Sequence, residues 1–113
     1  MKVLLINAAT LHVKHKPALP LGLLSIAKYL TDAGHQAAIY DRTVENKDLA
    51  KRLESFEPDI VGISALTNKQ FRDAAAVSTE LKKIGIPVVW GGATASAIPD
   101  IILKSGVVDY VVV

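Results

Sequence analysis

The feature that most constrains the fold is a regular alternation between short apolar runs and segments with helical spacing. Four runs are continuously apolar and rich in β-branched residues, which is typical of strands buried on both faces of a parallel sheet. A fifth run is more mixed in polarity and suits an edge strand. The four buried runs cover 3–6, 60–64, 86–90 and 108–113, and the mixed run covers 36–40.

The segments between these runs carry apolar residues three or four positions apart, which predicts amphipathic helices. Each begins at a capping or first-turn residue and ends at a glycine or before a proline. The predicted segments run from Pro20 to Gly34, from Asn46 to Pro58, from Asn68 to Gly85 and from Pro99 to Gly106. The residues expected on the buried face of the first helix are Leu21, Leu24, Ala27 and Leu30.

Strict alternation of buried strands and helices predicts an α/β fold with right-handed crossovers and helices on both faces of the sheet. Five strands favour a doubly wound parallel sheet of order 2-1-3-4-5, the flavodoxin-like (Rossmann-like) arrangement. The length of 113 residues fits one domain over 1–113. The chain stops at Val113, so we expect the final helix to be missing, the domain to be cut at its carboxyl end, and an apolar strip to be left for a partner or a second copy to cover.

Composition narrows the function. The net charge of +2 is small and scattered, which argues against a nucleic-acid partner. No apolar run approaches the roughly 20 residues that span a membrane, so we expect no membrane partner and a cytoplasmic location. The chain has no cysteine, which excludes thiolate metal sites and iron-sulfur clusters within these residues.

A ligand of such a sheet is expected at the carboxyl ends of the strands, near the reversal of strand order between the first and third strands. Gly91 and Gly92 directly follow a strand and let a ligand approach the backbone, because no Cβ stands in the way. Ser64 ends the neighbouring strand with a hydroxyl that can donate and accept a hydrogen bond. Two alternatives stay open, a plain turn at the glycines and a helix cap at Ser64. The candidate binding residues are Ser64, Ala65, Leu66, Thr67, Gly91, Gly92, Ala93 and Thr94.

The loop after the first strand is long and basic, and its ionisable residues are His12, Lys14, His15 and Lys16. A metal ligand or a phosphate contact is one interpretation, but a solvated basic loop is favoured because no second ligand converges on it. We therefore predict no metal site. Asp41 stands where dinucleotide folds carry an acidic residue, yet the G-x-G-x-x-G sequence is absent, and we treat Asp41 as a loop residue without a catalytic role.

Several segments together resemble one known family, the N-terminal cobalamin-binding domains of radical-SAM enzymes. The similarity runs over the whole chain, from its first strand to its last. The matching segments are KVLLIN at 2–7, PLGLL at 20–24, AGH at 33–35, PDIVGIS at 58–64, PVVWGG at 87–92 and VDYVV at 108–112.

The resemblance implies a cofactor and the residues that hold it. The wider superfamily uses Asp-x-His-x-x-Gly after the first strand, Ser-x-Leu after the third and Gly-Gly after the fourth. The last two match Ser64-Ala65-Leu66 and Gly91-Gly92, whereas neither histidine of the first loop has the spacing or the preceding aspartate of the first motif. The resemblance thus implies cobalamin without a histidine on cobalt. Ser64, Leu66, Gly91 and Gly92 are then expected to line the channel for the nucleotide tail.

The family also implies how the module is used. Cobalamin would relay a methyl group, or take part in a related step, in an enzyme whose iron-sulfur cluster and S-adenosylmethionine belong to a C-terminal radical-SAM domain beyond these residues. No catalytic activity is expected from this chain alone. The alternative is a domain of the same fold that binds no cofactor and serves as a structural or docking unit against a catalytic partner.

Overall fold

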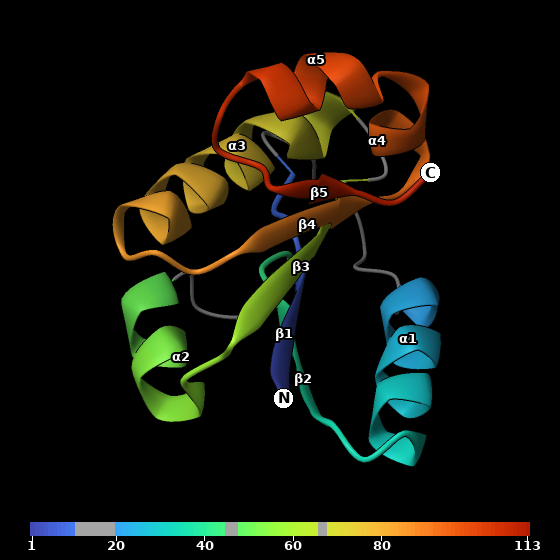
Figure 1. Ribbon diagram of the computed structural model, residues 1–113, viewed down its shortest axis with the longest axis vertical. Helices are drawn as coiled ribbons and strands as arrows, with labels where there is room; N and C mark the ends of the chain where they lie inside the picture. Colours follow the sequence, from blue (N-terminus) through green and yellow to red (C-terminus); the bar gives the residue numbers. More distant parts are fainter. Residues whose placement is uncertain (11–19, 45–47, 66–67) are drawn as a thin grey trace.

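The computed structural model describes residues 1–10, 20–44, 48–65 and 68–113, and shows a five-stranded parallel sheet of order β2-β1-β3-β4-β5. The predicted flavodoxin-like α/β architecture is confirmed (Figure 1). The strands are β1 (Lys2–Asn7), β2 (Gln36–Asp41), β3 (Ile60–Ser64), β4 (Val88–Gly91) and β5 (Tyr110–Val111). The helices are α1 (Leu21–Asp32), α2 (Leu49–Phe56), α3 (Asn68–Lys83), α4 (Ala93–Ala97) and α5 (Pro99–Lys104).

Helices cover the two faces of the sheet unequally. Figure 1 shows α1 on one side of the sheet and α2 and α3 on the other. The larger core lies on the α2/α3 side, where Trp90 and Tyr40 are fully buried together with residues of β1 and β3. The smaller core joins Val3 and Leu5 to Leu23 of α1. Apolar contacts on both faces explain why the strands are continuously apolar.

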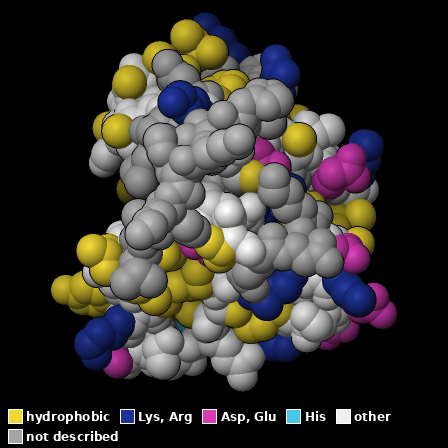
Figure 2. All heavy atoms as spheres, turned by 180° about the vertical axis from the view of Figure 1, so that it is seen from behind, with side chains coloured by type: hydrophobic (Ala, Val, Ile, Leu, Met, Phe, Trp, Pro, Cys, Tyr) yellow, Lys and Arg dark blue, Asp and Glu magenta, His cyan; other side chains and the backbone are white. Residues whose placement is uncertain are grey.

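The buried face of α1 differs from the predicted one. Leu23 is buried and Ala27 and Leu30 pack beside it, whereas Leu21 and Leu24 are 67% and 43% exposed. Most positions of this helix are apolar, so a face that begins at Leu21 and Leu24 and a face that begins at Leu23 fit helical spacing equally well. Packing against β1 and β2 determines which of the two faces is buried. In Figure 2, which views the molecule from behind, hydrophobic side chains gather on the side where α1 lies.

Two helix boundaries also differ. The side chain of Asp48 accepts a hydrogen bond from the Lys51 N–H and caps α2, a role predicted for Asn46, which lies outside the described residues. Residues 93–97, predicted as a loop, form α4, which starts after Gly92 at φ +106°. Five small residues gave no apolar periodicity to reveal this helix, although Ala95 is buried.

The last strand is shorter than predicted. Its two residues, Tyr110 and Val111, are in register with β4, and the N–H groups of Asp109 and Val112 on either side donate to the Val88 and Trp90 carbonyls. Val108, predicted as part of the strand, is buried in the core before it. Tyr110 and Val112 are 59% and 62% exposed, so the apolar strip expected along this edge is present. Among the described residues, no helix is long and apolar enough to cross a membrane.

Candidate functional site

Four strands each place one residue in a single row at the carboxyl edge of the sheet. In register order the row reads Asp41, Asn7, Ser64 and Gly91, from β2, β1, β3 and β4. Because side chains alternate along a strand, all four positions belong to the α1 side of the sheet, opposite the core that contains Ile6, Ile63 and Trp90. We call these four residues the edge row.

The α1 side is covered over only part of its width. The helix residues that pack on it come from α1 and reach β1, β2 and the start of β3. Beyond them lie Gly62 and Val89, both half-buried, with Tyr110 exposed at the end of the same register row. In the described part of the chain this half of the face carries no packed helix, and it leads directly to Ser64 and Gly91.

Glycines shape this half of the face in two ways. A Cβ built on Gly62 would lie 3.0 Å from Leu5 Cδ2, so a side chain there would need Leu5 to move. A Cβ built on Gly91 meets no atom within 4 Å and would point into open space. Gly91 is not among the glycines with positive φ, so its backbone does not require glycine. The missing side chain at position 91 therefore leaves room rather than relieving backbone strain.

Ser64 ends β3 with its hydroxyl at the carboxyl edge of the sheet. No hydrogen bond joins this hydroxyl to another residue in the described parts of the chain, and it is not among the fully buried atoms that lack a partner. Helix α3 begins at Asn68, four residues later, so Ser64 does not occupy the capping position directly before it. A hydroxyl at the carboxyl edge, beside the space at Gly91, is suited to bind a ligand.

The other candidate residues divide into three groups. Ala65 is fully buried in the α3-side core, and its N–H donates to the Gly91 carbonyl, so it supports the edge without lining it. Gly92 is the residue before α4, and Ala93 and Thr94 lie in the first turn of that helix rather than in a loop. The remaining candidates, Leu66 and Thr67, lie outside the described residues.

The sequence did not reveal a polar network at the same edge. The Asn7 side-chain amide donates to Asp41 Oδ1 at 3.1 Å and accepts from Gln70 Nε2 at 3.0 Å, and Gln70 also donates to the Ala8 carbonyl at 2.8 Å. Asp41 and Gln70 are both buried. The signal available was Asp41 itself, which stands at a strand end and which we had treated as a loop residue.

A largely buried ion pair, Arg42 with Asp73, lies beside this network. Arg42 binds both carboxylate oxygens of Asp73, at 2.8 and 2.9 Å, and the Ala9 N–H donates to the same carboxylate at 2.8 Å. The hydrogen bond to Asp73 raises the pKa of the Arg42 guanidinium, against the opposing effect of burial. The pair thus ties the end of β1 and the end of β2 to the first turns of α3.

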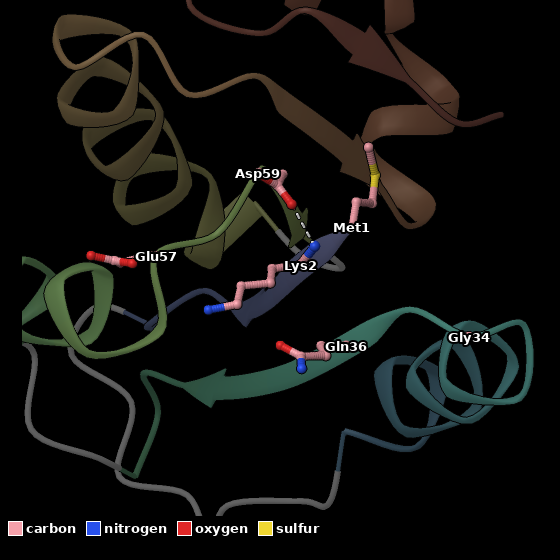
Figure 3. A pocket seen from close by; sticks show the side chains of 6 residues that line it. All are labelled: Met1, Lys2, Gly34, Gln36, Glu57 and Asp59. Carbon is pink, nitrogen blue, oxygen red and sulfur yellow. Dashed lines mark hydrogen bonds between the residues drawn. The ribbon is translucent and has the colours of Figure 1, made fainter.

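The opposite, amino edge of the sheet holds a polar depression of about 490 Å³ (Figure 3). There the Asp59 carboxylate accepts a hydrogen bond from the Lys2 N–H, which joins the starts of β1 and β3. His35 lies at this edge too, with Nδ1 2.9 Å from the amino group of Met1. His35 is six residues before Asp41, which puts roughly 20 Å of extended strand between His35 and the edge row. His12 and His15 lie outside the described residues, and the described ones contain no group of three metal-ligating side chains.

Comparison with protein families identifies the chain. A model of the B12-binding domain matches residues 8–113, nearly the whole length. The chain belongs to the B12-binding domain family. An uncharacterized methyltransferase of Pyrococcus horikoshii, PH0819, is 33% identical to this B12-binding domain over an alignment of 113 residues, which covers 92% of the chain and 24% of the relative. The domain therefore spans about a quarter of that protein's length.

The edge row fits the ligand that the family implies. Cobalamin combines a broad corrin ring, bordered by carboxamides, with a long nucleotide tail. The space at Gly91 and the Ser64 hydroxyl, which has no hydrogen-bond partner among the described residues, are compatible with such a tail, and the half-buried Val89 lies beside them. Asn7 is the register neighbour of Ser64 in the edge row.

Proposed function

We propose that this chain binds cobalamin at the carboxyl edge of its sheet, with the nucleotide tail passing over Ser64 and Gly91. The observation that supports this most is the pairing of Ser64 with Gly91 in one register row, where a Cβ on Gly91 would meet no atom within 4 Å. Bound cobalamin would supply a cobalt centre that carries a methyl group. The chain's own residues bind and orient it.

The path for the tail is apolar along its length and polar at its mouth. Val89 forms the floor, Gly62 and the Leu5 side chain that lies against it border Val89 on one side, and Tyr110 borders it on the other. Covering this surface with an apolar base removes both from water, which is worth about 25 cal/mol for each Å² of apolar area buried. Ser64 then provides a hydrogen bond at the mouth, where the phosphate and sugar of the tail carry acceptors and donors.

We further propose that no histidine of this chain ligates cobalt. The chain lacks Asp-x-His-x-x-Gly after β1, and His35 lies at the opposite edge of the sheet. Cob(II)alamin bound to the protein is expected to give an electron paramagnetic resonance spectrum without nitrogen splitting from a protein imidazole. Replacing both His12 and His15 by Ala should leave the spectrum and Kd unchanged, and a spectral change in that variant would contradict the proposal.

The larger protein is proposed to be a radical-SAM methyltransferase, with this domain preceding a C-terminal radical-SAM domain that holds the iron-sulfur cluster and S-adenosylmethionine. The relative's name and its greater length support this. The cluster needs cysteines, and this chain has none. Reading the coding sequence beyond Val113 tests the proposal, which requires a C-x-x-x-C-x-x-C motif and fails if no such motif follows.

Titration with hydroxocobalamin tests the central proposal. Trp90 is the only tryptophan and precedes Gly91 on β4, so a nearby corrinoid that absorbs its emission should quench its fluorescence. We expect saturable quenching together with a change in the visible spectrum of the cofactor. Absence of saturation at high micromolar cofactor would refute cobalamin binding.

A second candidate function is a docking unit without a cofactor. It is favoured by the exposure of Tyr110 and Val112 beside β4, which a catalytic partner or a second copy of the chain could cover. This function predicts self-association, or association with the remainder of a larger enzyme, in the absence of corrinoid. Sedimentation of the 113-residue chain as a monomer at high concentration would argue against the homo-oligomer.

A further inference from the structure

Asn7 is the one member of the edge row with a side-chain amide, and its surroundings fix how that amide is turned. It ends β1, is half-buried, and pairs in register with Asp41 on one side and Ser64 on the other. Its own carbonyl accepts a hydrogen bond from the Arg42 N–H at 3.0 Å. Both the backbone and the side chain of Asn7 are therefore held.

The orientation of the Asn7 amide follows from partners that can only accept a hydrogen bond. The Ala8 carbonyl can only accept, so the Gln70 atom that contacts it must be nitrogen. The same nitrogen donates to Asn7, so the facing atom of Asn7 is its oxygen. On the other side the Asp41 oxygen accepts from the Thr43 N–H and therefore also faces the nitrogen of Asn7. Each end of the network assigns the same orientation.

The contacts with Asp41 and Gln70 make this orientation costly to change, and the ion pair of Arg42 and Asp73 holds the backbone beside it. Asp73 holds the Ala9 N–H, two residues beyond Asn7, while Arg42 holds Asp73 with two parallel hydrogen bonds. Turning the Asn7 amide over would set its oxygen against the Asp41 carboxylate and its nitrogen against the Gln70 nitrogen. Both contacts would be repulsive in a site where the partners are buried.

Half of the hydrogen-bonding capacity of this amide is unused. A side-chain amide has two N–H groups and two lone pairs on its oxygen. Among the described residues, Asn7 uses one N–H toward Asp41 and one lone pair toward Gln70. One donor and one acceptor remain, in fixed orientation, next to the uncommitted hydroxyl of Ser64. A donor and an acceptor on one rigid amide complement another carboxamide.

We propose that Asn7 contacts the ligand and pairs with one of the carboxamides at the edge of the corrin ring, with Asp41 and Gln70 acting as positioning residues. This inference rests on the proposed function, because it takes the ligand to be a corrinoid. It selects corrinoids that keep their carboxamides over those in which the contacted amide has become a carboxylate. A carboxylate there would lose its donor to Asn7 and would lie near the charge of Asp41.

The first test changes the ligand and leaves the protein intact. Hydroxocobalamin and its separate monocarboxylic acid derivatives, each with one peripheral carboxamide hydrolysed, are titrated against the 113-residue chain. We expect one derivative to bind roughly tenfold more weakly than hydroxocobalamin and the others to bind within about twofold. Equal Kd values for every derivative would overturn the role of Asn7 while leaving cobalamin binding established.

The second test compares Asn7→Ala with Thr43→Val. Thr43 donates to the same Asp41 oxygen but lies outside the edge row, so its variant perturbs the network without removing the proposed contact. We expect Asn7→Ala to raise the Kd for hydroxocobalamin roughly tenfold. The monocarboxylic derivative that binds weakly to wild type should then bind to Asn7→Ala with the same Kd as hydroxocobalamin. Thr43→Val should keep the wild-type discrimination.

Three outcomes would count against the proposal in different ways. Discrimination that survives in Asn7→Ala would assign the contact to another residue. Loss of discrimination in both variants would show that any disturbance of the network abolishes it, and would remove the evidence for a direct Asn7 contact. Failure of the wild-type chain to bind hydroxocobalamin would overturn this inference together with the proposed function, a result that differs from normal binding without discrimination.

Discussion

Filling the space at Gly91 should block the nucleotide tail without disturbing the fold. We choose Gly91→Val because valine suits a strand and because a Cβ at this position meets nothing within 4 Å. Gly92 is a poorer choice, since its φ of +106° would strain any other residue and confuse lost binding with lost structure. We expect the free energy of unfolding of Gly91→Val to stay within about 1 kcal/mol of wild type.

The expected loss of affinity follows from the area that the tail would no longer bury. If the new side chain keeps the base from the floor at Gly62 and Val89, apolar burial on the order of 100 Å² is lost. At about 25 cal/mol per Å² this is roughly 2.5 kcal/mol, or about a 70-fold rise in the Kd for cobalamin.

Two probes and one control variant make this prediction specific. Kd is measured by quenching of Trp90, with hydroxocobalamin and with cobinamide, which keeps the corrin ring but lacks the nucleotide tail. Gly91→Val should affect hydroxocobalamin strongly and cobinamide by less than about threefold. Gln36→Val places the same side chain on an exposed position of β2 at the amino edge and should change neither. A Gly91→Val protein that binds hydroxocobalamin like wild type would refute the proposed tail path.

Three further predictions concern the fold around the site. Leu23→Ala should lower the free energy of unfolding by about 2–4 kcal/mol and Leu24→Ala by less than about 1 kcal/mol, in urea denaturation, because only Leu23 packs on the sheet; equal losses would contradict the buried face of α1 described above. Asp73→Ala should cost about 3–5 kcal/mol, since it leaves the buried Arg42 charge without its carboxylate, and a loss below about 1 kcal/mol would show that the pair is dispensable. Because the pKa of Arg42 is raised in the folded state, its charge stabilises the fold fully below the unfolded pKa, and this stabilisation is lost only as pH rises through the folded pKa. Between about pH 6 and pH 9 the difference in free energy of unfolding between wild type and Asp73→Ala should therefore stay constant, and a fall in that difference with rising pH would contradict the assignment.

The architecture could be predicted because each of its determinants is local in sequence. Buried parallel strands are recognisable as continuous apolar runs, and the order of elements along the chain then leaves few topologies. The face of α1 could not be predicted, since Leu21, Leu23 and Leu24 are equally apolar and only the sheet distinguishes them. Helix α4 was missed for a related reason, because small residues carry little periodic signal.

The candidate site was predictable only where the type of residue and its place at a strand end point to ligand binding. The glycines after one strand and the serine at the end of the next indicated a ligand only in combination, and the register confirms that Ser64 and Gly91 are adjacent. The network around Asn7 joins residues more than thirty and more than sixty positions apart in the sequence. No local pattern relates Asn7 to Gln70, so their meeting depends on the tertiary fold.

The edge row has a consequence for how the chain reaches its native state. Its four residues come from four strands, and a slip of one residue in any strand would turn that strand's member toward the opposite face. A misregistered sheet would thus keep much of its apolar burial yet lose the row. Because a ligand that contacts Asn7, Ser64 and Gly91 together binds only the correct register of their three strands, it would draw misaligned chains toward the native pairing by mass action. Cofactor present during folding should therefore raise the fraction of chains that reach the native strand register.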